Sequence, residues 1–451
     1  MGERVSAEGD AAISRDSEHI SRGFSAVQYK TVFTIALFIF VASMLYVAQE
    51  HVAPSFAYLG YTPRAETGAE FALATLSTLI IALIAPTDVR NASTSAYGFL
   101  AVTVFAPITW VPVYYGTLSS EDLNAVFLTS TASFLCMRIT LIGGRHEIGI
   151  ARLSPRLVSS ILVPIFLASL GMMILLFDLR PEAVSLEEVY DKRNEYADLT
   201  APEIGYVFGA LVNAVLPLLF MVGVVLRKLT LAAVSIAGFV LAFSVTGFKS
   251  YIVAVGLVAL AFLVSRARVG LAQQWALVLS IVLWSAALLD NFTGSITATS
   301  FLVRRAILTA GLNTSYYIDY FSDSQKFELR HSILGLLGDP PSSLNPPKLI
   351  GSQYYSSDAM SANANFIADG FANFGTLGAI GAAAALGLLL RFFDGATRGI
   401  SGPTAAIALL PILVVASNSG ILTTLLTHGG LVLLILVFIT QFQKGLTSGP
   451  G

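Results

Sequence analysis

Twelve apolar segments, each about long enough to cross a lipid bilayer, constrain this chain more than any other feature. A bilayer core about 30 Å thick needs about 20 apolar residues per helix. In lipid every backbone polar group must be bonded within its own segment, so apolar runs of this length form helices. The sequence therefore predicts an all-α, polytopic integral membrane protein with about 12 transmembrane helices. The predicted segments are Thr31–Gln49, Phe71–Ala85, Tyr97–Tyr115, Asn124–Ile142, Leu157–Phe177, Gly205–Leu226, Thr230–Phe248, Ser250–Ser265, Leu271–Leu289, Phe371–Leu390, Pro403–Leu422 and Gly429–Phe442.

Composition and charge exclude the common soluble classes. Hydrophobic residues make up 55% of the 451 residues and charged residues only 12%, about half the charged fraction of an ordinary soluble domain. The formal net charge is −2 and the charges are dispersed, whereas a nucleic-acid-binding protein would carry a basic balance. We therefore expect the lipid bilayer, and no nucleic acid, among the partners of this chain.

The distribution of Lys and Arg predicts the orientation of the chain, because short cytoplasmic connections are enriched in these residues. If the N-terminus is inside, alternate connections are basic, and those between them have few bases and many acids. The basic connections and the C-terminal tail carry Arg90, Arg145, Arg152, Arg156, Arg227, Lys228, Arg266, Arg268, Arg391, Arg398 and Lys444. We therefore place both termini in the cytoplasm.

These patterns divide the chain into five parts. Residues 1–30 form a polar cytoplasmic tail, residues 31–289 hold transmembrane helices 1–9, and residues 290–370 form one large loop. Residues 371–443 hold helices 10–12, and residues 444–451 form a second cytoplasmic tail. The large loop then lies outside the membrane, where we expect the active site.

The large loop carries positive charge on the side where the other connections lack it, which suggests an anionic ligand. Its cationic side chains are Arg304, Arg305, Lys326, Arg330, His331 and Lys348. Within it, Ser300–Phe321 has helical spacing and is predicted to lie on or near the membrane surface. The Arg304 and Arg305 pair suits a lipid-linked phosphate, because a guanidinium bonds phosphate oxygens bidentately. The alternative is contact with lipid headgroups or capping of the preceding helix.

Lys249 lies in the tight turn between the seventh and eighth predicted helices, at the outer boundary of the membrane. A charge in so short a hairpin is costly unless it is exposed or paired, and charges at membrane boundaries are by default functional candidates. We add Lys249 to the anion-binding set. The alternative is a lysine whose stem lies along apolar surface while its head reaches water.

Two histidines are candidates for a general base, because histidine titrates near neutral pH and its neutral ring can take a proton from a hydroxyl. His331 follows Arg330, a further candidate cation, in the large loop. The alternative for His331 is a solvated surface side chain. His428 lies at the outer end of the last two predicted helices, closer to lipid, and is an equal rival.

Asn365, Asp369 and Asn373 recur every four residues at the start of the tenth predicted helix, which puts three hydrogen-bonding groups on one helix face. Such a face can bind sugar hydroxyls, and Asp369 can serve as a base or as a partner of the loop arginines. The alternative is a polar seam packed between helices, with nearby glycines allowing close approach. The two interpretations are compatible.

The sequence lacks the familiar motifs for metal or nucleotide chemistry. It has no GxxxxGK[ST], HExxH or GxSxG motif, no Cys and His cluster with metal spacing, and no Asp-x-Asp pair in the first outer connection. We therefore expect chemistry without a metal or cofactor, in which arginine or lysine stabilises the charge of a leaving phosphate.

Four motifs, in this order, resemble those of the Wzy-type polymerases, which join the oligosaccharide repeat units of O-antigen and exopolysaccharide. They are TGFKS at 246–250, the Arg304 and Arg305 pair with LNTSYYIDYF at 312–321, PPKLIG at 346–351 and NANFIADGFANFGTLG at 363–378. The resemblance runs from Leu231 to His428 by motif and covers the whole chain by topology.

The resemblance implies a multi-pass enzyme of the bacterial cell inner membrane, with residues 290–370 as a large periplasmic loop. Such an enzyme moves a growing glycan from one undecaprenyl diphosphate carrier onto the non-reducing end of the next lipid-linked repeat unit. A chain-length regulator and a flippase are the implied partners. By the match, the diphosphate is bound by Lys249, Arg304 and Arg305, with Arg330 as a further candidate, and the base stays open among His331, Asp369 and His428.

We therefore expect a metal-independent, inverting membrane glycosyltransferase in which a sugar hydroxyl attacks the anomeric carbon directly. Asn365 and Asn373 join its substrate-binding set. Two alternatives stay open: a ligase that transfers the finished glycan to another acceptor, and a transporter or flippase of lipid-linked sugars. A transporter would show charged or broken helices near mid-membrane, whereas the apolar segments here carry few charges.

Overall fold

A computed structural model describes residues 25–143, 153–182, 188–265, 271–332, 335 and 338–442. These residues form helices joined by turns, with two isolated β-bridges and no strand among them. The all-α prediction is thus confirmed for the described part of the chain. Most of the two predicted tails and the basic residues Arg145, Arg152, Arg266, Arg268 and Lys444 lie outside the described residues.

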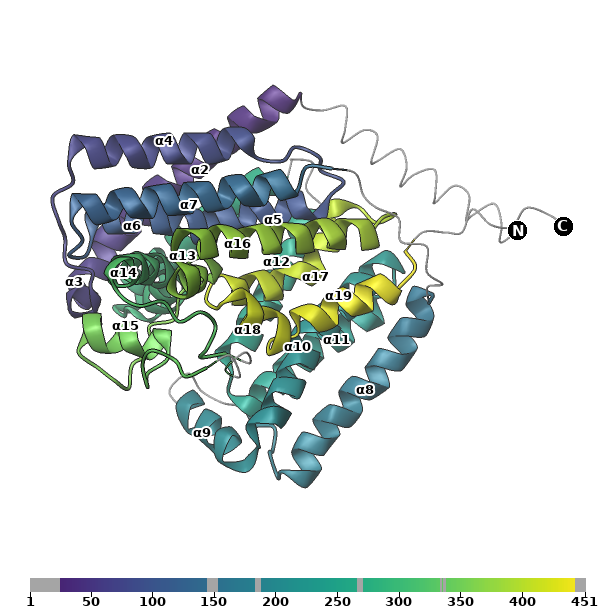
Figure 1. Cartoon of the computed structure of the whole chain (residues 1–451). Coiled ribbons are helices and arrows are strands. Elements are labelled where there is room, and N and C mark those ends of the chain that lie inside the picture. Colours follow the sequence, from purple (N-terminus) through teal and green to yellow (C-terminus); the bar gives the residue numbers. More distant parts are fainter. Residues whose placement is uncertain are drawn as a thin grey trace.

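Helices occupy all twelve predicted apolar segments. Among the described residues, eight continuous helices are long and apolar enough to cross a membrane by length and composition, and four apolar helices, α4, α12, α17 and α19, are shorter. The chain is therefore a helical, multi-pass membrane protein (Figure 1). The bounds are α2 Ala26–Val47, η1 Ala48–Val52, α3 Ala53–Phe56, η2 Ala57–Leu59, α4 Gly68–Ile84, α5 Ala92–Leu100, η3 Ala101–Phe105, α6 Ala106–Tyr114, α7 Ser120–Thr140, α8 Pro155–Leu176, α9 Val189–Leu199, α10 Pro202–Val225, α11 Leu229–Thr246, α12 Lys249–Ser265, α13 Leu271–Thr293, η4 Thr299–Leu308, α14 Thr309–Asp323, α15 Pro346–Tyr355, α16 Phe366–Ala396, α17 Gly402–Ala416, α18 Ile421–Leu426 and α19 Gly430–Ile439.

The continuous helix Ala92–Tyr114, made of α5, η3 and α6, forms the centre of the bundle. It is apolar on every side, which is typical of a helix that is buried. The whole of its most apolar stretch is buried inside the protein. It packs against α4, α7, α13, α14, α16 and α17. The polar atoms of large buried side chains find partners there, as where the indole nitrogen of Trp275 donates to Ser95 Oγ at 2.8 Å.

Alternate connections gather at opposite ends of the bundle. At one end Gly60 and Gly116, from two different connections, both adjoin the ring of Tyr316. At the other end the backbone of Gly402 adjoins Asn91. Each of these two pairs of connections, which the sequence predicts to share a side of the membrane, shares an end of the bundle.

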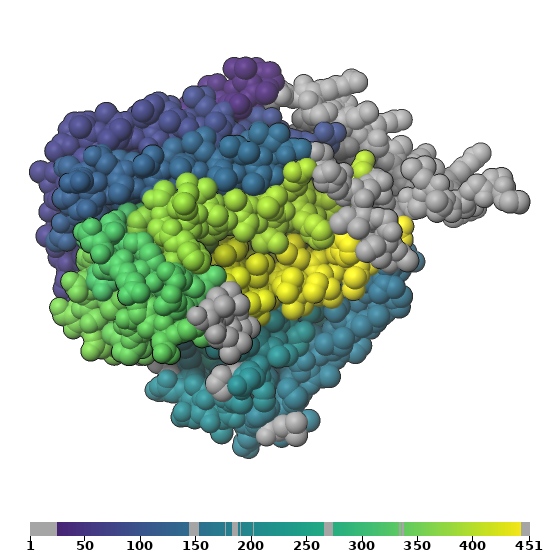
Figure 2. Space-filling view, viewed as in Figure 1, coloured from purple at the N-terminus to yellow at the C-terminus, as the bar shows by residue number. Residues whose placement is uncertain are grey.

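Most of the region predicted as a large loop is helical. The helix expected over 300–321 is present as η4 and α14, but α14 is buried against α6, α7 and α16 instead of lying exposed on the membrane surface. In Figure 1 α14 is seen nearly end-on, whereas α4, α7 and α16 run across the page. Figure 2 shows η4, α14 and α15 in green at one end of the molecule. This end carries the candidate site.

Candidate active site

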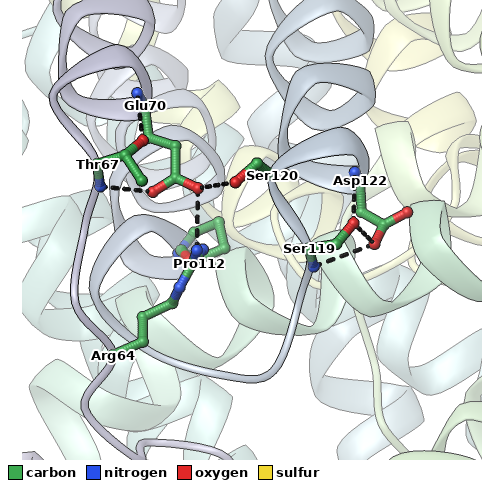
Figure 3. Close-up of polar contacts among 7 residues, drawn as sticks. All are labelled: Arg64, Thr67, Glu70, Pro112, Ser119, Ser120 and Asp122. Carbon is green, nitrogen blue, oxygen red and sulfur yellow. Dashed lines mark hydrogen bonds and ion pairs between the residues drawn. The ribbon is translucent and has the colours of Figure 1, made fainter.

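An ion pair holds the connection between α3 and α4 in place beside the start of α14 (Figure 3). The Arg64 guanidinium bonds the Glu70 carboxylate at 2.9 Å and the carbonyl of Pro112 at 3.2 Å. Ser120 donates to the same carboxylate at 2.8 Å, and Thr67 and Glu70 form a capping box that starts α4. The connection is therefore pinned to the ends of three helices. It carries Tyr61, whose hydroxyl lies 2.9 Å from Thr309 Oγ1 at the start of α14.

Arg304 is a buried cation in the π-helical segment η4, with 7% of its surface exposed. Its guanidinium lies over the ring of Phe56 at 4.2 Å and donates to Ser300 Oγ at 3.1 Å. Its Nε atom is buried without a hydrogen-bond partner, and no carboxylate among the described residues pairs with it. Burial lowers the pKa of Arg304. An unpaired buried charge is costly, so this site favours an anionic ligand.

Arg305 and Lys249 lie near the same segment. Arg305 is exposed. The Lys249 ammonium lies 5.9 Å from the ring centre of Phe301, which precedes Arg305 by four residues and so shares a side of the helix with it. The structure thus brings the three cations assigned to phosphate binding to one short segment.

Tyrosines complete the surroundings of Arg304. Tyr61 and Tyr355 lie within electrostatic reach of its guanidinium. The Tyr355 hydroxyl donates to Asn313 Oδ1 at 2.6 Å, and the rings of Tyr316 and Tyr354 stack at 4.3 Å. These contacts hold α15 against α14 and close one side of the arginine site.

Helix α16 is broken near its start. Phe374 has φ −143° and ψ 22°, and Gly375 has φ 63° and ψ −151°, so the helical hydrogen-bond ladder stops there. Across the break Gly370 and Gly378 approach so closely that a Cβ atom on Gly370 would lie 2.5 Å from the Gly378 carbonyl oxygen. Only glycine fits this approach, which is the packing role that the sequence gave as the alternative for these glycines.

The carbonyl groups left free by the break bind the loop that follows α14. The amide of Phe327 donates to the carbonyl of Ala372 at 3.0 Å, and that of Glu328 to the carbonyl of Asn373 at 3.2 Å. The amide of Leu329 donates to the Asn373 side-chain oxygen at 2.7 Å. Three consecutive loop amides are therefore tied to one turn of α16.

His331 faces Asp369 across this contact. Its Nε2 atom lies 3.8 Å from Asp369 Oδ1, and its ring meets the ring of Phe327 edge-on at 5.1 Å. The Asp369 carboxylate also adjoins Gly420 and Tyr317. Burial lowers the pKa of His331, so the ring is neutral at neutral pH. The 3.8 Å separation is longer than a hydrogen bond, so the two side chains are close but not bonded in this structure.

The other candidate residues lie apart from this pair or have internal partners. Asn365 caps α16 and donates to Thr314 Oγ1 at 2.8 Å, so both ends of its amide are occupied. Arg330 pairs with Glu328. His428 lies beyond the end of α18, where its amide donates to the Thr423 carbonyl at 3.2 Å and burial lowers the pKa of its ring.

Comparison with protein-family models, curated proteins and solved structures finds no match to this chain. The site is therefore interpreted from its own geometry. Within the described residues no group of three or more His, Cys, Asp or Glu side chains could hold a metal ion. Sequence reasoning missed Phe56 and Tyr61, because nothing near them in the sequence indicates that they contact a segment about 250 residues away.

Proposed function

We propose that this protein is a repeat-unit polymerase, a metal-independent glycosyltransferase that moves a growing glycan from undecaprenyl diphosphate to the non-reducing end of a lipid-linked repeat unit. The observation that supports it most is Arg304, a buried guanidinium without a carboxylate partner among the described residues. Arg305 follows it in η4, and the Lys249 ammonium lies by Phe301 of the same segment. Diphosphate is the anion that such a set of cations suits best, because it carries several negative charges and many acceptor oxygens.

The two halves of the site lie along one helix. Thr309, which bonds the Arg304 carbonyl, begins α14, and Tyr317, beside Asp369, is eight residues further on. At 1.5 Å per residue Thr309 and Tyr317 are about 12 Å apart along the helix axis, and Arg304 lies about one further helical turn before Thr309. We place the diphosphate at the cations and the donor sugar toward Asp369.

The reaction follows from this arrangement. A hydroxyl oxygen of the acceptor sugar attacks the anomeric carbon of the donor, and the bond between that carbon and the diphosphate oxygen breaks. The hydroxyl proton passes to the His331 and Asp369 pair, and the electron pair leaves with the diphosphate. The cations at η4 stabilise the charge that develops there. Attack from the side opposite the leaving group gives inversion.

The same proposal places the site at the periplasmic face of the bacterial inner membrane, with both termini in the cytoplasm. The part of α16 after the break, residues 376–396, is about 31 Å long at 1.5 Å per residue and spans a bilayer core by itself. The break and the His331 pair then lie at the outer edge of the membrane. There they can meet the polar headgroup of a lipid-linked substrate supplied by a flippase.

The test is the ladder of surface polysaccharide in a strain that lacks the protein and is complemented with variants. Arg304→Ala, Arg305→Ala and Lys249→Ala are expected to abolish long chains while single repeat units persist. Arg180→Ala is the matched control, because Arg180 is exposed on the same predicted side and pairs with Asp178. A normal ladder from all three variants would mean that these cations are not needed for polymerisation. Unattached full-length polymer would identify a ligase instead.

A transporter or flippase is the second candidate, and the break in α16 favours it, because transporters place discontinuous helices at their substrate sites. Purified protein in liposomes with lipid-linked repeat units separates the two. A polymerase lengthens the glycan without moving lipid between leaflets. If the lipid-linked repeat units move between leaflets and the glycan is not lengthened, the protein is a transporter and not a polymerase.

A further inference from the structure

The loop at residues 327–331 adopts an unfavourable backbone conformation. Glu328 has φ 51° and Leu329 has φ 64°, the left-handed region that is strained for a residue with a side chain. Two such residues in succession persist only where surrounding contacts hold them. The contacts here are the three loop amides bonded to Ala372 and Asn373.

Asn373 joins the two halves of the histidine and aspartate pair. Its Nδ2 atom donates to the backbone carbonyl of Asp369 at 2.8 Å, and its Oδ1 atom accepts from the amide of Leu329, two residues before His331, at 2.7 Å. Its side chain is 1% exposed. It is therefore closed to a substrate sugar, and both ends of its amide are used inside the protein.

We propose that Asn373 is a positioning residue that holds the 327–331 loop on the broken end of α16 and so keeps His331 facing Asp369. The inference deepens the proposed function, since it takes the pair as the acceptor of the hydroxyl proton. It replaces the expectation that Asn373 binds sugar. Leucine at this position keeps the size of the side chain but removes both hydrogen bonds.

Kinetics of the purified full chain test the role. Asn373→Leu is expected to lower kcat about 100-fold, the effect of misplacing a catalytic group by about 1 Å, while KM for the lipid-linked acceptor changes little. In a His331→Ala background the same substitution should cost almost nothing, because the group that it positions is gone. Equal losses in both backgrounds would overturn the proposal, and so would a rise in KM with unchanged kcat.

The matched control is Asn213→Leu. Asn213 is also a buried asparagine of an apolar helix, α10. The loop amides bond Ala372 and Asn373 and not Asn213, so in each background this variant should have the kcat of its parent. A loss of kcat equal to that of Asn373→Leu would mean that general damage to the helix bundle, rather than the loop contact, lowers the rate.

Hydrogen exchange tests the contact without any activity. In Asn373→Leu the peptide covering residues 324–332 should exchange at least about 10-fold faster, because the Leu329 amide loses its acceptor, and Asn213→Leu should leave it unchanged. Unaltered exchange in Asn373→Leu would overturn the proposal. If the wild-type protein transfers no sugar but Asn373→Leu still exchanges faster, Asn373 holds the loop as proposed. In that case it is the proposed glycosyltransferase function that fails.

Discussion

The two halves of the candidate site satisfy polar groups in opposite ways. Around η4, the Arg304 guanidinium is buried among aromatic rings and has no carboxylate partner within the described residues. At the break in α16, by contrast, the backbone groups freed by Phe374 and Gly375 are taken up by the neighbouring loop. One half leaves charge for a ligand to satisfy. In the other half the backbone is satisfied within the protein, and the His331 Nδ1 atom is a buried side-chain atom there without a hydrogen-bond partner in the described part of the chain.

This difference indicates a division of labour. A buried cation without a partner gains most from an anion whose charge grows during the reaction, so it contributes to the stability of the transition state. A pair held by backbone hydrogen bonds contributes position and protonation state. If the division is real, substitutions in the two halves change different kinetic quantities.

The largest effect is expected at the His331 and Asp369 pair. His331→Ala and Asp369→Asn should each lower kcat about 10²–10⁴-fold, the usual contribution of general acid–base catalysis. The kcat of the double variant should be close to that of the less active single variant, because the two side chains act as a unit. Single-turnover transfer of radiolabelled repeat units measures this. His428→Ala is the comparison, and a loss confined to His428→Ala would move the base there.

A somewhat smaller effect is expected at the arginine half. Arg304→Ala should lower kcat/KM about 10²–10³-fold, as for the loss of one strong electrostatic contact to a transition state. Arg304→Lys should recover only part of the lost kcat/KM, because lysine lacks the planar guanidinium that bonds two oxygens at once. Arg180→Ala is the matched control, since Arg180 is exposed and pairs with Asp178 outside the 327–331 loop. Equal losses for Arg304→Ala and Arg180→Ala would erase the contrast between buried and paired cations.

The positions of the helices followed from local sequence patterns, whereas the break in α16 did not. Hydropathy over about 20 residues is a local property, so each apolar segment could be located, for example Leu157–Phe177 against the observed Pro155–Leu176. The tenth segment was expected to start at Phe371 but starts at Phe366. Its capping residue, Asn365, had been grouped with the sugar-binding side chains.

The arrangement of the site could not be predicted, because it depends on contacts between residues far apart in the sequence. His331 and Asp369 were named as separate candidates for the base, and their proximity depends on the break at Gly375 and on the loop bonded to it. The aromatic ring under Arg304 comes from Phe56, in a helix at the far end of the chain. Contacts over such sequence distances arise from tertiary packing, which no local pattern predicts.

Gly375 offers a way to disturb the half at the break in α16 without changing its side chains. Its φ and ψ angles of 63° and −151° lie in a region that is essentially restricted to glycine. Gly375→Ala should therefore destabilise the protein by about 1–3 kcal/mol, although the nearest atom to an added Cβ, on Lys326, is 3.5 Å away. Gly381→Ala, later in α16 with open space around it, should be neutral or stabilising. Thermal unfolding in detergent compares them, and equal midpoints would mean that the break is not strained.

The smallest expected effect is a shift of the pH profile. Burial lowers the pKa of His331, so the ring is neutral, and active as a base, down to a pH below the ordinary histidine value of about 6.5. Activity is then retained above the folded pKa and lost as the pH falls through it. The same depression makes the folded state less stable below about pH 6.5, because the unfolded chain binds the proton more readily.

Phe327 sharpens this last prediction, because its ring covers His331 and is 1% exposed. Phe327→Ala admits water to the imidazole, so the acid limb of kcat/KM should move to higher pH, whereas Phe327→Leu, which keeps the apolar cover, should leave it in place. Asp369→Asn should move the limb the other way, because a carboxylate 3.8 Å from the ring favours the imidazolium. If the acid limb of kcat/KM persists in His331→Ala and responds to none of these variants, another group titrates there. His331 would then not be the base.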